Sequence, residues 1–410
     1  MDNRNSIKGL VKEIKSAPIG LKLSSLLVWC LLMSGYPFVF TYMIGYPSLL
    51  FIVFFFLLML LFCFSKKKLK SPQIGLGLSV MWLFFLFQFL LHGAISSISS
   101  MVQIIIVGVL FLFIENYISI ITMIRQYILV IATIVIIAFL GGVLEFITGA
   151  QPLFYYTAHN GKSVAVFLFT VCNSGIDFVT HPIIRSSGIF DEPGTLAFYT
   201  MIALLLNAIY LKNKRIEKIL LFLPITTFSV AHIMTFILYI LLFKIKKKKQ
   251  FILYTLLAGI ITYGIYLAKD TEYHRIYQIT VERFDKEDGE YKGNSRADLS
   301  HKAQKAFNEN ILFGIGASEQ GDDSMASNPF TLLAYYGILG YIVVMIFFWD
   351  CLFYCLHLPL SQYKYNCLKC LVILFTNFQQ RPFGTNIVVF SSVLLLIIYI
   401  KRSLKYKQIE

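Results

Sequence analysis

The stretch that decides the fold runs from Arg185 to Tyr199 and reads RSSGIFDEPGTLAFY. It holds an arginine, two adjacent acids and a proline, and an uncharged apolar run over 194–211 overlaps its end. An apolar run of that length suffices for a helix to cross the hydrocarbon core of a bilayer. The stretch is therefore a charged turn at the boundary of a predicted membrane span, where charged side chains lie next to the hydrocarbon core of the bilayer.

The composition of the whole chain also requires a bilayer as its solvent. Of the 410 residues, 57% are hydrophobic and 14% are charged, and the mean hydropathy is +0.71. A soluble domain of this length cannot bury so much apolar surface. The sequence therefore predicts an all-α, polytopic integral membrane protein without a cleavable signal peptide. Apolar runs predict spans over 21–36, 47–64, 74–91, 98–115, 127–147, 194–211, 250–268, 327–349, 365–378 and 384–400.

The segment 219–243 needs a separate interpretation, because basic clusters flank it on both sides. Basic clusters favour the cytoplasmic side, so the chain is expected to cross an even number of times between them. Two full spans need roughly 40 residues, and this segment is shorter. It is predicted to form two short helices or a re-entrant hairpin with its turn near 229–232. With these two, the chain has about 12 transmembrane helices in a single domain over 1–410.

The charge distribution predicts which side of the membrane each loop faces. The segments assigned to the cytoplasm hold 25 of the 36 Lys and Arg residues, but only 6 of the 22 Asp and Glu residues. This is the positive-inside pattern, and it places both termini in the cytoplasm. Two long loops, 148–193 and 269–326, then lie outside. The net charge of +14 reflects topology and contact with anionic lipid, so no nucleic-acid partner is expected.

The seven cysteines predict no disulfide framework, because only Cys172 falls outside the cytoplasm and the membrane. Four others have a spacing similar to that of a four-thiolate metal site: Cys351, Cys355, Cys367 and Cys370. Cysteine is also a common small filler at the ends of spans, so both interpretations stay open. The chain has no nucleotide-binding glycine loop, and neither a metal nor a cofactor is expected.

The first external loop offers an arginine and an acid seven residues apart, Arg185 and Glu192. A guanidinium suits a phosphate group, and a carboxylate can take a proton from a hydroxyl. Between the two residues, Gly188 starts a short, stiff turn that ends at Pro193 and holds side chains in one place. The alternative is that Asp191 and Glu192 only cap the next helix, with proline in its first turn. The pattern alone does not separate a catalytic Glu192 from a helix cap.

The second external loop predicts an amphipathic helix over 294–308 that lies on the membrane surface. Ser295 and Asp298 resemble a capping box at its start, and Arg296 falls in its first turn. Gly314 and Gly316 follow the helix and predict a tight turn or a close approach of backbone to ligand. Further along, Gly337 and Gly340 are expected to give the span over 327–349 a small-residue face for close helix packing.

In their order and sidedness, these motifs resemble the Wzy/WaaL superfamily of bacterial polysaccharide polymerases and O-antigen ligases. The resemblance rests on Arg185, Gly188, Phe190, Glu192, Pro193, Arg296, Phe307, Glu309, Asn310, Gly314, Gly316, Asn328, Gly337 and Gly340. It implies a GT-C-like membrane glycosyltransferase that acts on undecaprenyl-diphosphate-linked oligosaccharides outside the cytoplasm, with neither a sugar nucleotide nor a metal. The expected location is the bacterial inner membrane.

The resemblance also implies roles for individual residues. Arg185 and Arg296 would hold the diphosphate of the leaving lipid, and Glu192 would act as base toward the acceptor hydroxyl. Four further residues would contact the substrate: Arg381, Asn328, His232 and Arg283. The chain departs from the family pattern at Ser229-Val-Ala-His232, where members often carry Ser-Arg-x-Gly. It also has Ser327-Asn328 where the ligase branch has His-Asn, which favours a polymerase over a ligase.

The sequence thus predicts an O-antigen polymerase of lipopolysaccharide biosynthesis. Its partners would include the chain-length regulator and the flippase of the same pathway. Three alternatives stay open. An O-antigen ligase belongs to the same class, a lipid-linked oligosaccharide flippase to another, and a purely structural subunit of a synthesis complex would have no chemistry of its own. The predicted spans carry no charge near their centres and the external loops are long, and both features count against a flippase.

Overall fold

The structure is a computed structural model of the chain. It describes residues 26–32, 72–115, 119–149, 151–157, 163–173, 185–190, 192–245, 247–271, 274, 277, 282, 286–287, 290–291, 297–317, 325, 328–380 and 387–406. The chain divides into two compact units, and each is described by itself. Unit 1 comprises Met1–Ile134, Tyr199–Leu220 and Leu299–Glu410, and unit 2 comprises Val135–Phe198 and Leu221–Asp298.

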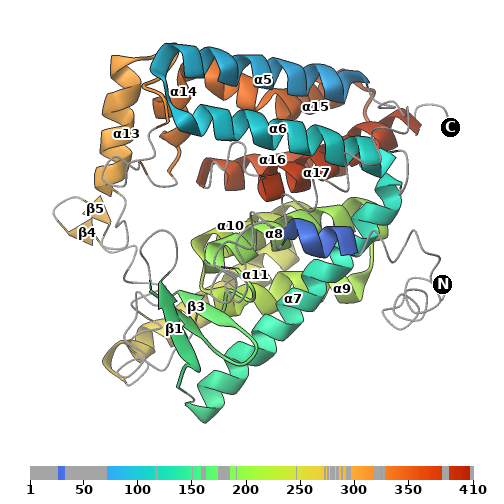
Figure 1. The fold of residues 1–410 in the computed structure, drawn as a ribbon. Helices are drawn as coiled ribbons and strands as arrows, with labels where there is room; N and C mark the ends of the chain where they lie inside the picture. The colour runs from blue at the N-terminus through green and yellow to red at the C-terminus, as the bar shows by residue number, and fades with distance from the viewer. Residues whose placement is uncertain are drawn as a thin grey trace. The chain divides into compact units, whose positions relative to one another are not determined.

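The described residues are mostly helical, as the sequence predicts, and four helices are long and apolar enough to cross a membrane (Figure 1). They are α5 (Pro72–His92), α6 (Ile95–Phe113), α7 (Ile120–Thr148) and α8 (Pro193–Leu206), the last extended by a π-turn over Asn207–Leu211. They confirm helices at four of the predicted spans. A bent pair, α14 (Thr331–Val344) and α15 (Ile346–His357), brings the number to five if it counts as one span.

The remaining predicted spans are matched only in part. Helices α11 (Lys248–Leu267), α16 (Gln362–Gln380) and α17 (Ile387–Tyr406) coincide with runs predicted near 250–268, 365–378 and 384–400, but they are not among those four. Of the run predicted over 21–36, residues 26–32 are described and are helical. The run over 47–64 lies outside the described residues. The membrane character of the chain is therefore supported, and a total of 12 spans stays a prediction.

The segment 219–243 is broken into short helices, as predicted. Helix α9 (Lys214–Phe222) continues into a 3-10 turn over Leu223–Thr227, and α10 (Val230–Tyr239) continues into a π-turn over Ile240–Lys244. The break falls at Phe228, whose φ of 45° and ψ of 35° are left-handed. A non-glycine residue adopts this conformation only at a cost, so the surrounding contacts must hold the chain there.

Small antiparallel sheets, which the sequence analysis did not predict, lie in the two segments assigned to the outside. Strands β1 (Phe154–Thr157), β2 (Ser163–Val166) and β3 (Val171–Asn173) form one sheet in that order, and β4 (Lys286–Glu287) pairs with β5 (Glu290–Tyr291). In the first sheet, Tyr155 lies opposite Ala165, and Ala165 lies opposite Cys172. Strands of two to four residues give too short a pattern to be recognised in an apolar sequence.

In unit 1, α5 and α6 form an antiparallel hairpin that packs beside α14, with α17 against α15 and α6 (Figure 1). Gly77 of α5 lets the ring of Phe347 approach, because a Cβ atom built there would lie 2.5 Å from a ring carbon. Ion pairs tie the end of α17 to its neighbours, Lys401 to Asp350 and Arg402 to Glu115.

Candidate functional site

Arg185 lies in unit 2, at the start of a short segment that hydrogen bonds hold on two sides. The next residue donates its N–H to the carbonyl oxygen of Thr226 at 3.1 Å. Ser187 donates its N–H to the carbonyl oxygen of Val171 at 2.9 Å, and Val171 donates its own N–H to the carbonyl oxygen of Gly188 at 3.0 Å. The segment therefore joins the edge of the β-sheet to the 3-10 turn before the break at Phe228.

The predicted turn around Gly188 is present. Gly188 has a φ of 62°, which an L side chain rarely adopts, and its N–H donates to Thr170 Oγ1 at 3.1 Å. Phe190 donates its N–H to the carbonyl oxygen of Ser187 at 3.0 Å, and its ring is buried. The turn is thus fixed by both backbone bonds and a buried aromatic side chain.

The guanidinium of Arg185 is bound to the break between the short helices. Its Nε donates to the carbonyl oxygen of Thr227 and its Nη2 to that of Phe228, each at 3.3 Å. Since a guanidinium has five N–H donors in a rigid plane, these two contacts fix its orientation. The side chain is half-buried. The two contacts stabilise the break, and the binding of a phosphate group by Arg185 stays a prediction.

Glu192 immediately precedes α8, where the capping interpretation places it. Its backbone carbonyl accepts the N–H groups of Thr195 at 3.0 Å and of Leu196 at 3.4 Å, and Pro193 is the first helical residue. The helix start predicted from proline is therefore confirmed. The side chain of Glu192 is half-buried. Because the backbone makes these two contacts, they do not require the carboxylate, and its catalytic role stays a prediction.

His232 is a buried residue of α10 that contacts the end of α9. Its Nε2 lies 3.1 Å from the carbonyl oxygen of Leu221, and the residue is buried. It therefore links α10 to the end of α9. This contact gives His232 a structural role between the two helices, and its predicted contact with substrate stays a prediction.

Gly142 of α7 makes room for Ser186, the residue after Arg185. A Cβ atom built on Gly142 would lie 2.2 Å from Ser186 Oγ but 3.6 Å from its Cβ. Gly142 thus lets the Arg185 segment approach the helix. Neither residue was predicted as part of the site, although a Gly-Gly pair inside a predicted span is a signal for close backbone approach.

We expect Gly142→Ala to destabilise the protein and Ser186→Ala to restore most of the loss. The first change forces the hydroxyl of Ser186 out of its position at a cost of about 1 kcal/mol, whereas the second removes the oxygen that is overlapped. The measurement is thermal unfolding of the two single variants and the double variant in detergent. If Ser186→Ala did not rescue Gly142→Ala, the close approach of the two residues would be wrong.

In unit 1, the predicted amphipathic helix is α13 (Ala297–Glu309), and its apolar stripe packs on protein. Ala303 and Ala306 lie in a buried cluster with Met325 and Ala334, flanked by Phe330 and Tyr335 of the α14 region. The prediction that this helix lies on the membrane surface is thus replaced, for its apolar face, by contact with α14. An amphipathic stripe shows which face is covered, but not what covers it.

The segment 311–316, which follows α13, forms backbone hydrogen bonds with α14 where that helix is broken. Ile315 donates its N–H to the carbonyl oxygen of Ala334, and Ile338 donates its N–H to that of Ile311, at 2.9 and 2.8 Å. Gly337, at the break, has a φ of 65° and a ψ of −171°. The tight turn predicted at Gly314 is present with a φ of 70°. Gly337 therefore serves a backbone junction, whereas the sequence analysis expected it to provide a helix-packing face.

Asn328 lies just before α14 in an Asx turn. Its Oδ1 accepts the N–H of Phe330 at 2.8 Å, and its own N–H donates to Thr331 Oγ1 at 3.1 Å. The residue is 5% exposed. These contacts give Asn328 a structural role at the helix start, and its predicted contact with substrate is not tested by them.

Three predicted arginines, Arg283, Arg296 and Arg381, lie outside the described residues. Of the others, Arg185, Glu192 and His232 belong to unit 2 and Asn328 to unit 1. Within unit 2, Arg185 and His232 both bind backbone carbonyls of the short helical pair, at Thr227 and Phe228 and at Leu221. The structure thus joins the Arg185 segment to the broken helices.

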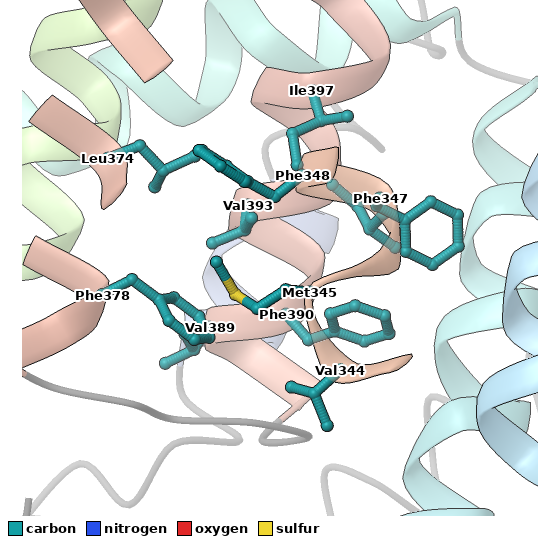
Figure 2. Close-up of a pocket in the computed structure, with 11 residues that line it drawn as sticks. Val344, Met345, Phe347, Phe348, Leu374, Phe378, Val389, Phe390, Val393 and Ile397 are labelled. Carbon is teal, nitrogen blue, oxygen red and sulfur yellow. The ribbon is translucent and has the colours of Figure 1, made fainter. Parts of the chain in front are cut away.

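The four cysteines on α15 and α16 are all buried, at Cys351, Cys355, Cys367 and Cys370. Among the described residues, no group of three or more His, Cys, Asp or Glu side chains is placed to hold a metal ion. Their burial agrees with the interpretation as small apolar filler. A small cavity of about 20 Å³ in unit 1 is also entirely apolar in its lining side chains (Figure 2). It offers nothing that recognises a sugar or a phosphate.

Comparison with known proteins gives no relative from which a function can be transferred. No family model, no curated protein and no solved structure matches the chain.

Proposed function

We propose that the protein is a membrane glycosyltransferase of the polysaccharide-polymerase type. It transfers a growing glycan from its undecaprenyl-diphosphate carrier to a sugar hydroxyl of an incoming lipid-linked repeat unit. The observation that carries the proposal is the fixed guanidinium of Arg185, which lies in the segment that leads into the apolar helix α8. A lipid-linked diphosphate presents its charge at such a boundary between a membrane span and water.

In the proposed reaction, the acceptor hydroxyl attacks the anomeric carbon of the donor sugar. The bond from this carbon to the diphosphate oxygen breaks, and undecaprenyl diphosphate leaves with the electron pair. Arg185 binds the diphosphate and stabilises the charge that develops on it. Glu192, seven residues further along, takes the proton from the hydroxyl. The donor arrives already activated, so the reaction requires no nucleotide.

A deletion of the gene separates this proposal from its alternatives. We expect the deletion strain to make lipopolysaccharide with a single repeat unit, because one unit is still exported and ligated without polymerisation. Loss of a ligase or of a flippase would instead leave bare core. A full ladder in the deletion strain would contradict all three functions, and a plasmid copy of the gene is the control for the phenotype.

A further inference from the structure

The turn that joins β2 to β3 carries two large apolar side chains. Phe167 donates its N–H to the carbonyl oxygen of Thr170 at 2.9 Å, so that Leu168 and Phe169 form the tip of this hairpin. Their exposed fractions are 60% and 50%. Tips of two residues usually carry Gly, Asn or Asp, which fit the backbone geometry and are solvated by water. An apolar tip indicates that the surrounding medium is not water.

The hairpin tip lies beside the membrane helix α7. A Cβ atom built on Gly141 would lie 3.0 Å from the Cβ atom of Phe169 and 3.2 Å from that of Thr170. Helix α7 continues to Thr148, so Gly141 is about 10 Å inside its end at the 1.5 Å rise of an α-helix. The tip therefore lies at a depth where α7 itself is expected to be inside the bilayer.

At this depth, the backbone N–H groups of the hairpin tip need hydrogen-bond partners within the protein, and Glu145 of α7 provides one. A backbone N–H in the hydrocarbon region must have a partner, because no water is there to accept it. The N–H of Leu168 donates to the carboxylate of Glu145. Glu145 is 3% exposed, and the sequence analysis did not single it out. The hairpin thus supplies one partner for this buried acid, while the Oε2 atom of its carboxylate has no hydrogen-bond partner among the described residues.

Further exposed apolar side chains lie at the end of α7 and at the start of the sheet. At the end of the helix, Phe146 and Ile147 are 46% and 75% exposed. Leu153 immediately precedes β1 and donates its N–H to the carbonyl oxygen of Val166, and Tyr155 lies on β1 two residues further along; the two side chains are 63% and 50% exposed. A tyrosine in such a position is typical of the membrane–water interface. Both α7 and the sheet next to it thus carry exposed apolar side chains.

We infer that the β2–β3 hairpin enters the bilayer leaflet that α7 reaches at its C-terminal end, and that Leu168 and Phe169 contact lipid acyl chains there. The same hairpin holds the Arg185 segment, through Thr170 and Val171 to Ser187 and Gly188. It therefore fixes the depth of that segment relative to the membrane. The inference rests on the hairpin, on α7 and on the exposed side chains, and it does not depend on the proposed reaction.

Fluorescence quenching of a single tryptophan at the tip tests the inference. The three native tryptophans, Trp29, Trp82 and Trp349, are replaced by phenylalanine, and the full chain with Phe169→Trp is reconstituted into phosphatidylcholine vesicles. Lipids brominated on the acyl chain report contact with hydrocarbon, and acrylamide reports contact with water. The reference is Gln304→Trp on the exposed side of α13. Leu168→Trp is the second tip variant, in case Phe169→Trp does not fold.

We expect the brominated lipid to quench the tip tryptophan at least twofold more than the reference, and acrylamide to quench it less than the reference. Strong quenching by acrylamide without quenching by the lipid would place the tip in water and overturn the inference. Quenching by neither would show that protein covers the tip, and it would overturn the inference as well.

Discussion

Replacing Arg185 by alanine is expected to reduce glycan polymerisation about a hundredfold or more. Removing one pre-organised group that stabilises developing charge has an effect of this size. Arg185→Lys is expected to recover little of the activity, because an ammonium is a point charge and cannot reproduce the planar fork that binds a diphosphate. The measurement is the formation of long chains from purified lipid-linked repeat units in proteoliposomes, together with the ladder of lipopolysaccharide on a gel.

The main competing explanation is that Arg185 only holds the fold. Its two bonds to the carbonyl oxygens of Thr227 and Phe228 contribute to stability, and their loss costs about 1–3 kcal/mol. Unfolding of each variant in detergent must therefore accompany the activity. Gly142→Ala is the matched control, because it disturbs the same segment through Ser186 without touching a charge. If Arg185→Ala and Gly142→Ala lost stability equally and activity equally, the role of Arg185 in phosphate binding would be wrong.

The sequence predicted the start of α8 well because its signal is local. A proline has a fixed φ and no N–H to donate, so Pro193 favours the first turn of a helix wherever the chain goes next. The partners of Arg185 could not be predicted in the same way. They are backbone carbonyls 42 and 43 residues further along, and a carbonyl has no side-chain signature in a sequence.

The prediction for Gly337 was incomplete for a related reason. The spacing of Gly337 and Gly340 fits a helix with a small-residue face, and Gly340 does lie close to the ring of Phe84. The φ of Gly337 depends instead on the chain that enters from 311–316, which the spacing does not show. The short strands were not predicted for a different reason. An apolar tip such as Leu168-Phe169 contains none of the turn residues by which a hairpin is usually recognised.

Replacing Gly337 by alanine is expected to give the largest loss of stability, about 3 kcal/mol or more. Its φ of 65° and ψ of −171° fall in a region that is almost restricted to glycine. A Cβ atom there would lie 2.3 Å from the carbonyl carbon and oxygen of Leu312, which are backbone atoms and cannot rotate away. Relieving the overlap separates the two segments, and the bond from Ile338 to Ile311 is then lost. Thermal unfolding in detergent measures the effect.

Gly264→Ala in α11 is the matched control, since no atom lies within 4 Å of a Cβ atom built there. In a helix, this exchange is expected to be neutral or slightly stabilising. The two variants differ in backbone conformation and in surroundings, but not in the group that is added. Equal unfolding temperatures for both would mean that α14 tolerates a side chain at the break. The junction between α14 and the chain after α13 would then not be the rigid support for Asn328 and the loop at Gly314 that the hydrogen bonds indicate.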